Sequence, residues 1–266
     1  HLVDSLLSLG IDIVKVFSPE HGFRGKADAG AKVEDRIDSE TGLSIISLYG
    51  KNKKPYPEQL EGIDIILFDI QDVGARFYTY ISTLHYIMEA ASEKNIKVII
   101  LDRPNPNSHY VDGPIREKGF ESFVGMHPIP IVHGMTIGEY AKMVNGEHWI
   151  VSNCDLIIIE MKNYTRNMSY ELIIKPSPNL PNAKAINLYP SLCLFEGTTV
   201  SIGRGTNYPF QHFGAPYLES SYSFTQKSCD GSKYPKHENK ECFGTDLRKE
   251  NTLNTINLDW IIEAYN

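Results

Sequence analysis

The sequence predicts an α/β fold, in which helices cover an open, mainly parallel sheet. Three runs of strand length are apolar on both faces, as buried parallel strands are: residues 11–17, 63–69 and 96–101. Between the last two runs, residues 76–94 carry apolar side chains three and four positions apart. That spacing predicts a crossover helix, which is how two parallel strands are joined.

The alternation of strand and helix continues further along the chain. We predict a strand at 130–132, a helix that starts at Thr136 and a strand at 156–161. Thr136 is the expected N-cap, and Glu139, three positions later, completes a capping box. This order of elements favours an open parallel sheet with helices on both faces.

The amino-acid composition changes from about residue 177, where Pro, Gly and aromatic residues become frequent. We expect one large domain over residues 1–205 and part of a smaller C-terminal lobe over 206–266. Residues 1–7 resemble the middle of an amphipathic helix, so we expect a first strand upstream of His1. Residues 256–266 resemble the start of a helix, so we expect the smaller lobe to continue beyond the last residue.

Composition excludes some classes of function. The net charge of −7 and the pI near 5.7 argue against nucleic acid as a partner, because phosphate backbones are bound by basic surfaces. No apolar run approaches the roughly 20 residues that span a bilayer, and the first residues lack the pattern of a signal peptide. We therefore expect a soluble chain without a membrane span.

The four cysteines lack the spacing of zinc ligands, so we predict no bound metal and no other cofactor. Cys229 and Cys242 flank a polar loop. They could pair in an oxidising compartment, or both could be free thiols.

Acidic residues follow the three strongest predicted strands. Glu20 follows the first, Asp69 and Asp72 follow the second, and Asp102 follows the third. Ligands of an open parallel sheet bind outside the carboxyl ends of its strands, so we expect these acids to lie together along that edge, a single rim of the sheet. For Asp72 and Asp102 the alternative is a plain N-cap of the following helix.

Basic residues lie in the same loops. His21 follows Glu20 directly and could be catalytic or a hydrogen-bonded structural histidine. Three arginines also lie there, namely Arg24, Arg76 and Arg103, and a fourth, Arg204, lies in the separate segment "SIGRGT". All four are in turns bounded by Gly or Pro and are either anchors for an anionic ligand or ordinary surface residues. Neither a P-loop nor a GxGxxG turn after a strand is present, so a nucleotide site is not supported.

Several long blocks of this sequence resemble one known family. The blocks "SPEHGFRG", "DIILFDIQDVGARFYTYISTL", "VIILDRPNPN" and "YPSLCLFEGTTVSIGRGTNYPFQHFGAP" occur in the order found in the NamZ-like exo-β-N-acetylmuramidases of bacteria. The resemblance covers residues 10–217. It implies a Rossmann-like lobe, an auxiliary lobe and a cleft between them that releases terminal N-acetylmuramic acid from the non-reducing ends of peptidoglycan fragments. It also implies a periplasmic or secreted location and muropeptides or disaccharides as partners, but no oligomeric state.

The resemblance assigns roles to individual residues. The Glu–His pair of the family corresponds to Glu20 and His21, with Glu20 as the suspected catalytic acid. Asp72 is a candidate nucleophile or base, although the acetamido oxygen of the sugar could attack instead. We expect an arginine (Arg24, Arg103 or Arg204) to bind the lactyl carboxylate. The full set of predicted substrate-binding residues is Arg24, Asp69, Arg76, Asp102, Arg103, Asn105, Glu196, Arg204 and Gln211.

Two other classes of function remain open at this point. A metal-dependent phosphatase or esterase could hold Mg²⁺ through Asp69, Asp72 and Asp102. A non-catalytic muropeptide-binding protein would also suit two lobes around a cleft. Turnover of a muramic acid glycoside separates the enzyme from the binding protein.

Overall fold

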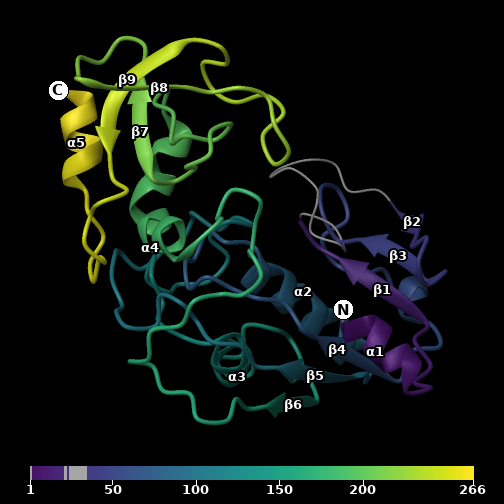
Figure 1. The fold of residues 1–266 in the computed structure, drawn as a ribbon. Helices are drawn as coiled ribbons and strands as arrows, with labels where there is room; N and C mark the ends of the chain where they lie inside the picture. The colour runs from purple at the N-terminus through teal and green to yellow at the C-terminus, as the bar shows by residue number, and fades with distance from the viewer. Residues whose placement is uncertain (1, 21–22, 24–34) are drawn as a thin grey trace.

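The computed structural model describes residues 2–20, 23 and 35–266, and it has an α/β fold (Figure 1). Its strands form three separate three-stranded sheets. In chain order the elements are α1 (Leu2–Ser8), β1 (Lys15–Ser18), β2 (Arg36–Ile37), β3 (Ser44–Ser47), the 3-10 helix η1 (Pro57–Leu60), β4 (Ile65–Phe68), α2 (Tyr80–Glu93), β5 (Lys97–Leu101), α3 (Ile137–Gly146), β6 (Leu156–Ile159), α4 (Ala183–Leu192), the 3-10 helix η2 (Cys193–Gly197), β7 (His212–Ala215), β8 (Tyr222–Thr225), β9 (Glu241–Asp246) and α5 (Asp259–Tyr265).

The central sheet contains β4, β5 and β6, all parallel, as the sequence predicts. Helices α2 and α3 pack against β5 and against each other. Ile66, Val98 and Ile100 form the sheet side of one hydrophobic core, which Leu84 of α2 and Tyr140 of α3 complete. The core forms because both helices place apolar residues on one stripe, which they bury against the sheet.

The opposite face of the central sheet differs from the expectation of helices on both faces. Side chains alternate along a strand, so Ile65, Leu67, Ile157 and Ile159 point away from α2 and α3. These four side chains are between 39% and 51% exposed. In the described part of the chain, the helical layer formed by α2 and α3 therefore covers one face only.

The first predicted strand is shorter than expected and belongs to another sheet. The strand begins at Lys15, and Ile11 and Val14 before it are 52% and 47% exposed. Strand β1 pairs in parallel with β3, which in turn pairs with β2. The expected single rim is therefore divided, because Glu20 follows a strand of the first sheet whereas Asp69 and Asp102 follow neighbouring strands of the central sheet.

The prediction of a strand at 130–132 is wrong. Val132 forms isolated bridges with Ala75 on one side and Asp112 on the other, without a continuous ladder. Pro130 has no backbone N–H to donate, which limits pairing at this point. The helix predicted from Thr136 is confirmed, since Thr136 caps α3 and accepts a hydrogen bond from the Glu139 backbone N–H.

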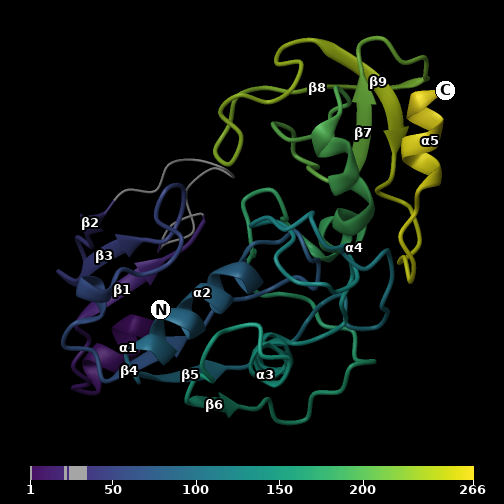
Figure 2. The same cartoon turned by 180° about the vertical axis from the view of Figure 1, so that it is seen from behind.

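The C-terminal part of the chain forms an antiparallel sheet in the order β7-β9-β8. It lies with α5 at the opposite end of the molecule from the central sheet, and α4 lies between this sheet and the rest of the chain (Figure 2). Its hydrophobic core includes Phe195, Phe213 and Trp260 and also takes in Val73 and Tyr78 from the loop after β4. The division at residues 205 and 206 stays a prediction.

Two further observations complete the fold. None of the helices in the described residues is long and apolar enough to span a membrane. The thiols of Cys229 and Cys242 are unpaired, with Cys229 exposed and Cys242 buried, so the free-thiol alternative holds.

Candidate active site

The carboxyl group of Glu20 lies at the N-terminus of helix α2. Its Oε1 accepts a hydrogen bond from the Tyr49 hydroxyl at 3.0 Å, and its Oε2 accepts one from the Thr79 hydroxyl at 3.2 Å. The Tyr80 hydroxyl donates to the backbone oxygen of Glu20 at 3.3 Å. These contacts join three chain segments at one carboxyl group.

The local sequence explains how these donors reach Glu20. Thr79 is the N-cap residue of α2, and Tyr80 is the first residue of that helix. Tyr49 follows β3, the parallel neighbour of β1, so both strands end on the same side. The positive end of the helix dipole favours a negative charge at this position.

Tyr49 is held as a proton donor. Burial and the neighbouring charge of Glu20 raise the pKa of Tyr49 to about 12. Its hydroxyl therefore keeps its proton at neutral pH and fixes one oxygen of Glu20, while Thr79 fixes the other.

A row of aromatic rings leads away from Glu20. The ring centroids of Tyr80 and Tyr78 lie 4.9 Å apart, those of Tyr78 and Tyr189 lie 5.9 Å apart, and those of Tyr189 and Phe210 lie 5.0 Å apart. The Arg204 guanidinium lies 4.9 Å from the Phe210 centroid. The row connects Glu20 with Arg204 through packed side chains. Tyr78, Tyr80 and Phe210 are almost fully buried, so their rings pack within the protein.

The far end of this row is an ion pair. Arg204 Nε and Nη2 donate to Glu196 Oε1 at 2.8 and 2.7 Å. The segment that carries Glu196 is held by Lys236, which lies in the connection between β8 and β9. Four backbone oxygens, those of Phe195, Glu196, Thr198 and Val200, surround the three donors of the Lys236 ammonium at 2.8 to 3.3 Å.

Asp72 lies in the interior, with 4% of its surface exposed. Its Oδ2 accepts the Gly74 backbone N–H at 2.7 Å and lies 3.5 Å from His133 Nε2. Asp72 Oδ1 and His133 Nε2 have no hydrogen-bond partner in the described structure. Burial raises the pKa of Tyr140 well above its usual value, and the nearby negative charge of Asp72 raises it further. Asp72 is thus enclosed by its neighbours, and its role as nucleophile or base stays a prediction.

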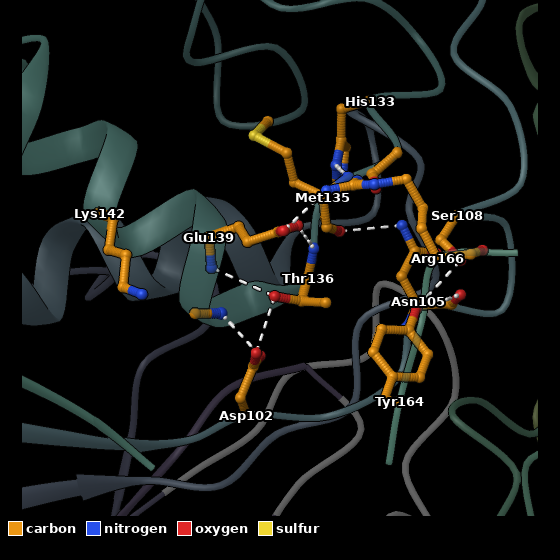
Figure 3. A network of polar contacts seen from close by, with 12 residues as sticks. Asp102, Asn105, Ser108, His133, Met135, Thr136, Glu139, Lys142, Tyr164 and Arg166 are labelled. Atoms are coloured by element: carbon orange, nitrogen blue, oxygen red, sulfur yellow. Dashed lines mark hydrogen bonds and ion pairs between the residues drawn. The ribbon is translucent and has the colours of Figure 1, made fainter. Parts of the chain in front are cut away.

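Asp102 binds the N-terminus of α3 (Figure 3). Its Oδ1 accepts the Gly138 backbone N–H at 2.9 Å, and its Oδ2 accepts the Thr136 hydroxyl at 2.8 Å. Glu139 of the same helix forms an ion pair with Arg166 at 2.7 Å. These contacts support the helix-capping alternative for Asp102, and its role in substrate binding stays a prediction.

The remaining predicted residues have partners within the protein. Asp69 accepts a hydrogen bond from Arg103 Nε at 2.7 Å, and Arg76 donates to the backbone oxygens of Pro114 and Ile129. The Asn105 side chain donates to the Met135 oxygen at 2.9 Å, and Gln211 accepts from Asn182 at 3.3 Å. Gln211 Nε2 is buried and lacks a partner in the described residues. The predictions for His21 and Arg24 lie outside the described residues.

Sequence reasoning did not find Tyr49 and Thr79. A threonine just before a helical apolar stripe is an N-cap signal, and it could have identified Thr79. Tyr49 had no such signal, because its contact with Glu20 depends on the pairing of β1 with β3.

The three aspartates of the metal-site alternative have different partners. Asp69 binds Arg103, Asp72 binds Gly74, and Asp102 binds the start of α3. Over residues 2–20, 23 and 35–266, no three His, Cys, Asp or Glu side chains are grouped so that they could hold a metal ion. This arrangement gives the metal-dependent phosphatase or esterase no support.

Fold and site together define an α/β protein whose candidate active site is a glutamate fixed by hydroxyl donors at a helix N-terminus. The family model "Exo-beta-N-acetylmuramidase NamZ, N-terminal" matches residues 1–184, and the C-terminal model of the same family matches residues 187–266. The chain therefore belongs to the NamZ exo-β-N-acetylmuramidase family, as the sequence motifs predict.

Individual relatives agree with this assignment. The peptidoglycan beta-N-acetylmuramidase NamZ of Bacillus subtilis (strain 168) is 49% identical over 216 residues, which is 79% of this chain and 52% of that protein. The chain thus spans about half the length of this curated relative. Two crystal structures of DUF1343 family proteins from Bacteroides fragilis NCTC 9343 match with TM-scores of 0.91 and 0.84, at 50% and 33% identity. The matched regions cover 100% and 99% of this chain, and 73% of each crystallised chain.

Proposed function

We propose that the protein is a glycoside hydrolase that releases terminal N-acetylmuramic acid from the non-reducing ends of peptidoglycan fragments. Family membership supports the reaction class, and the placement of Glu20 between Tyr49 and Thr79 is the observation that carries it. Within this proposal the large domain is Rossmann-like, the C-terminal sheet is part of an auxiliary lobe, and the protein works in the periplasm or outside the cell.

In the proposed mechanism Glu20 is the general acid. Glycoside cleavage requires a proton on the leaving oxygen while positive charge develops at the sugar carbon. Tyr49 and Thr79 each bind one oxygen of Glu20, so they fix the plane of the carboxyl group and the direction of proton transfer. The α2 N-terminus then favours the carboxylate that remains after the proton has left.

The second role in catalysis is assigned by burial. Asp72 is 4% exposed, accepts the Gly74 backbone N–H and lies 3.5 Å from His133 Nε2, so we propose that it acts through its charge. The acetamido oxygen of the sugar or a water molecule then attacks the sugar carbon. Arg204 is held by Glu196 and is connected with Glu20 through the row of packed aromatic rings. It is our candidate for binding the lactyl carboxylate.

The direct test is turnover of a chromogenic N-acetylmuramic acid glycoside, with the matching N-acetylglucosamine glycoside as control. We expect hydrolysis of the first substrate and at least about tenfold less of the second, because the Arg204 guanidinium would lose its carboxylate partner in the second. Tight binding without turnover would instead identify a muropeptide-binding protein. Activity that disappears with EDTA would support the metal-dependent alternative.

A further inference from the structure

The C-terminal sheet carries an open hollow of about 450 Å³ that the proposed reaction does not use. It is formed by the turn after Arg204 and by strand β8, whereas Glu20 is held by Tyr49, Thr79 and Tyr80. The hollow is lined by Gly205, Thr206, Asn207, Tyr208, His212, Tyr222, Phe224, Thr225, Lys227 and Cys229.

The aromatic rings of this hollow are fixed in place by other side chains. Phe224 stacks on His212 with 3.9 Å between centroids and 14° between the ring planes. The Arg248 guanidinium lies 4.5 Å from the Tyr208 centroid and 5.9 Å from that of Tyr222. Rings that are ordered before a ligand arrives lose little conformational entropy when the ligand binds.

The floor of the hollow is the His212 ring, which hydrogen bonds and close packing hold in place. His212 is 1% exposed, and its two ring nitrogens contact the hydroxyls of Thr206 at 3.1 Å and Tyr222 at 2.7 Å. A Cβ atom at Gly203 would lie 2.2 Å from the His212 ring, so only glycine fits there. Burial lowers the pKa of His212 to about 4, and the ring is therefore a neutral hydrogen-bonding bridge at neutral pH.

The charges around the hollow favour a neutral or anionic ligand. None of the lining residues is acidic, and Lys227 is exposed and forms no ion pair within the described part of the chain. Arg248 is already neutralised by Asp246, which it binds through two hydrogen bonds of 2.8 Å. Thr206, Asn207 and Thr225 add hydroxyl and amide groups to the wall.

We propose that this hollow binds a saccharide unit of the peptidoglycan glycan strand at a site separate from Glu20. Preordered rings with a few polar groups are typical of small-ligand sites, and a saccharide offers both apolar ring faces and hydroxyl groups. Tyr208, 41% exposed, contacts the sugar ring, and Lys227 binds a lactyl carboxylate. The site binds and does not cleave, because its wall lacks a carboxyl group and both nitrogens of His212 are engaged. The identity of the glycan rests on the proposed function.

Titration calorimetry of the full chain tests this site. With the Glu20→Gln variant as the non-cleaving background, the probe is a peptide-free tetrasaccharide of alternating N-acetylglucosamine and N-acetylmuramic acid. We expect Tyr208→Ala and Lys227→Ala each to weaken binding about tenfold, the loss typical of a key contact. Tyr265→Ala, at a tyrosine that is 90% exposed on α5, is the matched control and should bind like its parent.

Two further readouts keep the outcome decisive. Chitotetraose lacks the lactyl carboxylate, so Lys227→Ala should not weaken its binding, whereas Tyr208→Ala should. Hydrolysis of the chromogenic monosaccharide glycoside should be unchanged when Tyr208→Ala is made with Glu20 intact. Unchanged tetrasaccharide affinity in both variants overturns the proposal, and so does a loss of monosaccharide turnover, which would place the hollow in the active site. If the parent chain cleaves nothing, the proposed function fails, and the binding data still decide on this site.

Discussion

The ends of strands β1 and β5 place a carboxyl group at a helix N-terminus in two different ways. Asp102, after β5, accepts the backbone N–H of Gly138 and the hydroxyl of the capping Thr136. Glu20, after β1, accepts the side-chain hydroxyls of Tyr49 and Thr79 instead. Asp102 thereby fixes the start of α3, whereas Glu20, oriented by side chains, is the proton donor of the proposed mechanism. The position of an acid at a strand end therefore does not define its role, and its donors do.

The largest effect should come from Glu20. We expect Glu20→Gln to lower turnover of the muramic acid glycoside at least about a hundredfold, because the amide cannot donate the proton that general acid catalysis supplies. The glycoside assay measures this loss. Unfolding in urea should be nearly unchanged, since glutamine keeps an oxygen for one of the two hydroxyl donors. Near-normal turnover would remove Glu20 from the mechanism and erase the contrast with Asp102.

Asp72 provides a third kind of strand-end acid, buried and bound by one backbone N–H. We expect Asp72→Ala to lower the free energy of unfolding by about 3 kcal/mol, since it leaves a cavity and a buried Gly74 N–H without its acceptor. Asp72→Asn keeps an acceptor for Gly74 and should lose clearly less. Urea denaturation of both variants measures the difference, and equal losses would show that the Gly74 contact is not what matters.

Asp102 should affect stability more than activity. Asp102→Ala removes the acceptor for Gly138 and Thr136, and we expect a loss of about 1–2 kcal/mol in the free energy of unfolding, as for other helix caps. Turnover measured below the unfolding transition should change less than about threefold, because surface and structural sites away from the reacting atoms act mainly on stability. A loss of activity as large as that of Glu20→Gln would show that Asp102 takes part in catalysis as Glu20 does.

The smallest effect in free energy should come from the donor to Glu20. Tyr49→Phe deletes one hydroxyl, and we expect turnover to fall about five- to tenfold, the equivalent of one hydrogen bond of about 1 kcal/mol. Tyr265→Phe on α5 is the matched control. If Tyr49→Phe changed only thermal stability and left kcat and KM as they were, the hydroxyl would not orient Glu20.

Much of the fold could be predicted because its signals are local. The apolar stripe of α2, the capping box of Thr136 and Glu139, and the runs that became β4 to β6 are each contained in a short segment. The extent of β1 could not be predicted, since the apolar Ile11 and Val14 precede the strand and stay exposed. The strand expected around Val132 failed because its neighbours, Ala75 and Asp112, come from loops far away in the sequence.

The site was predicted in part for the same reason. Glu20 stands out in the sequence because it follows a strand within a characteristic block. The contacts that distinguish it from Asp102 depend on tertiary structure, as Tyr49 lies 29 residues away and Thr79 lies 59 residues away. Burial of Asp72 likewise depends on His133 and the loop around Gly74, which no local pattern reveals.

The four backbone oxygens around the Lys236 ammonium have a consequence for redesign of this protein. Lys236 and the neighbouring His237, whose ring contacts the Thr199 oxygen, join the β8–β9 connection to the stretch from Phe195 to Val200, so residues before Lys236 can be added while these contacts are kept. Extra residues near the exposed Tyr234 should be tolerated, since lengthening a surface loop costs little entropy. The connection thus offers a place to graft a tag or a wall-binding peptide without displacing Glu196 and Arg204.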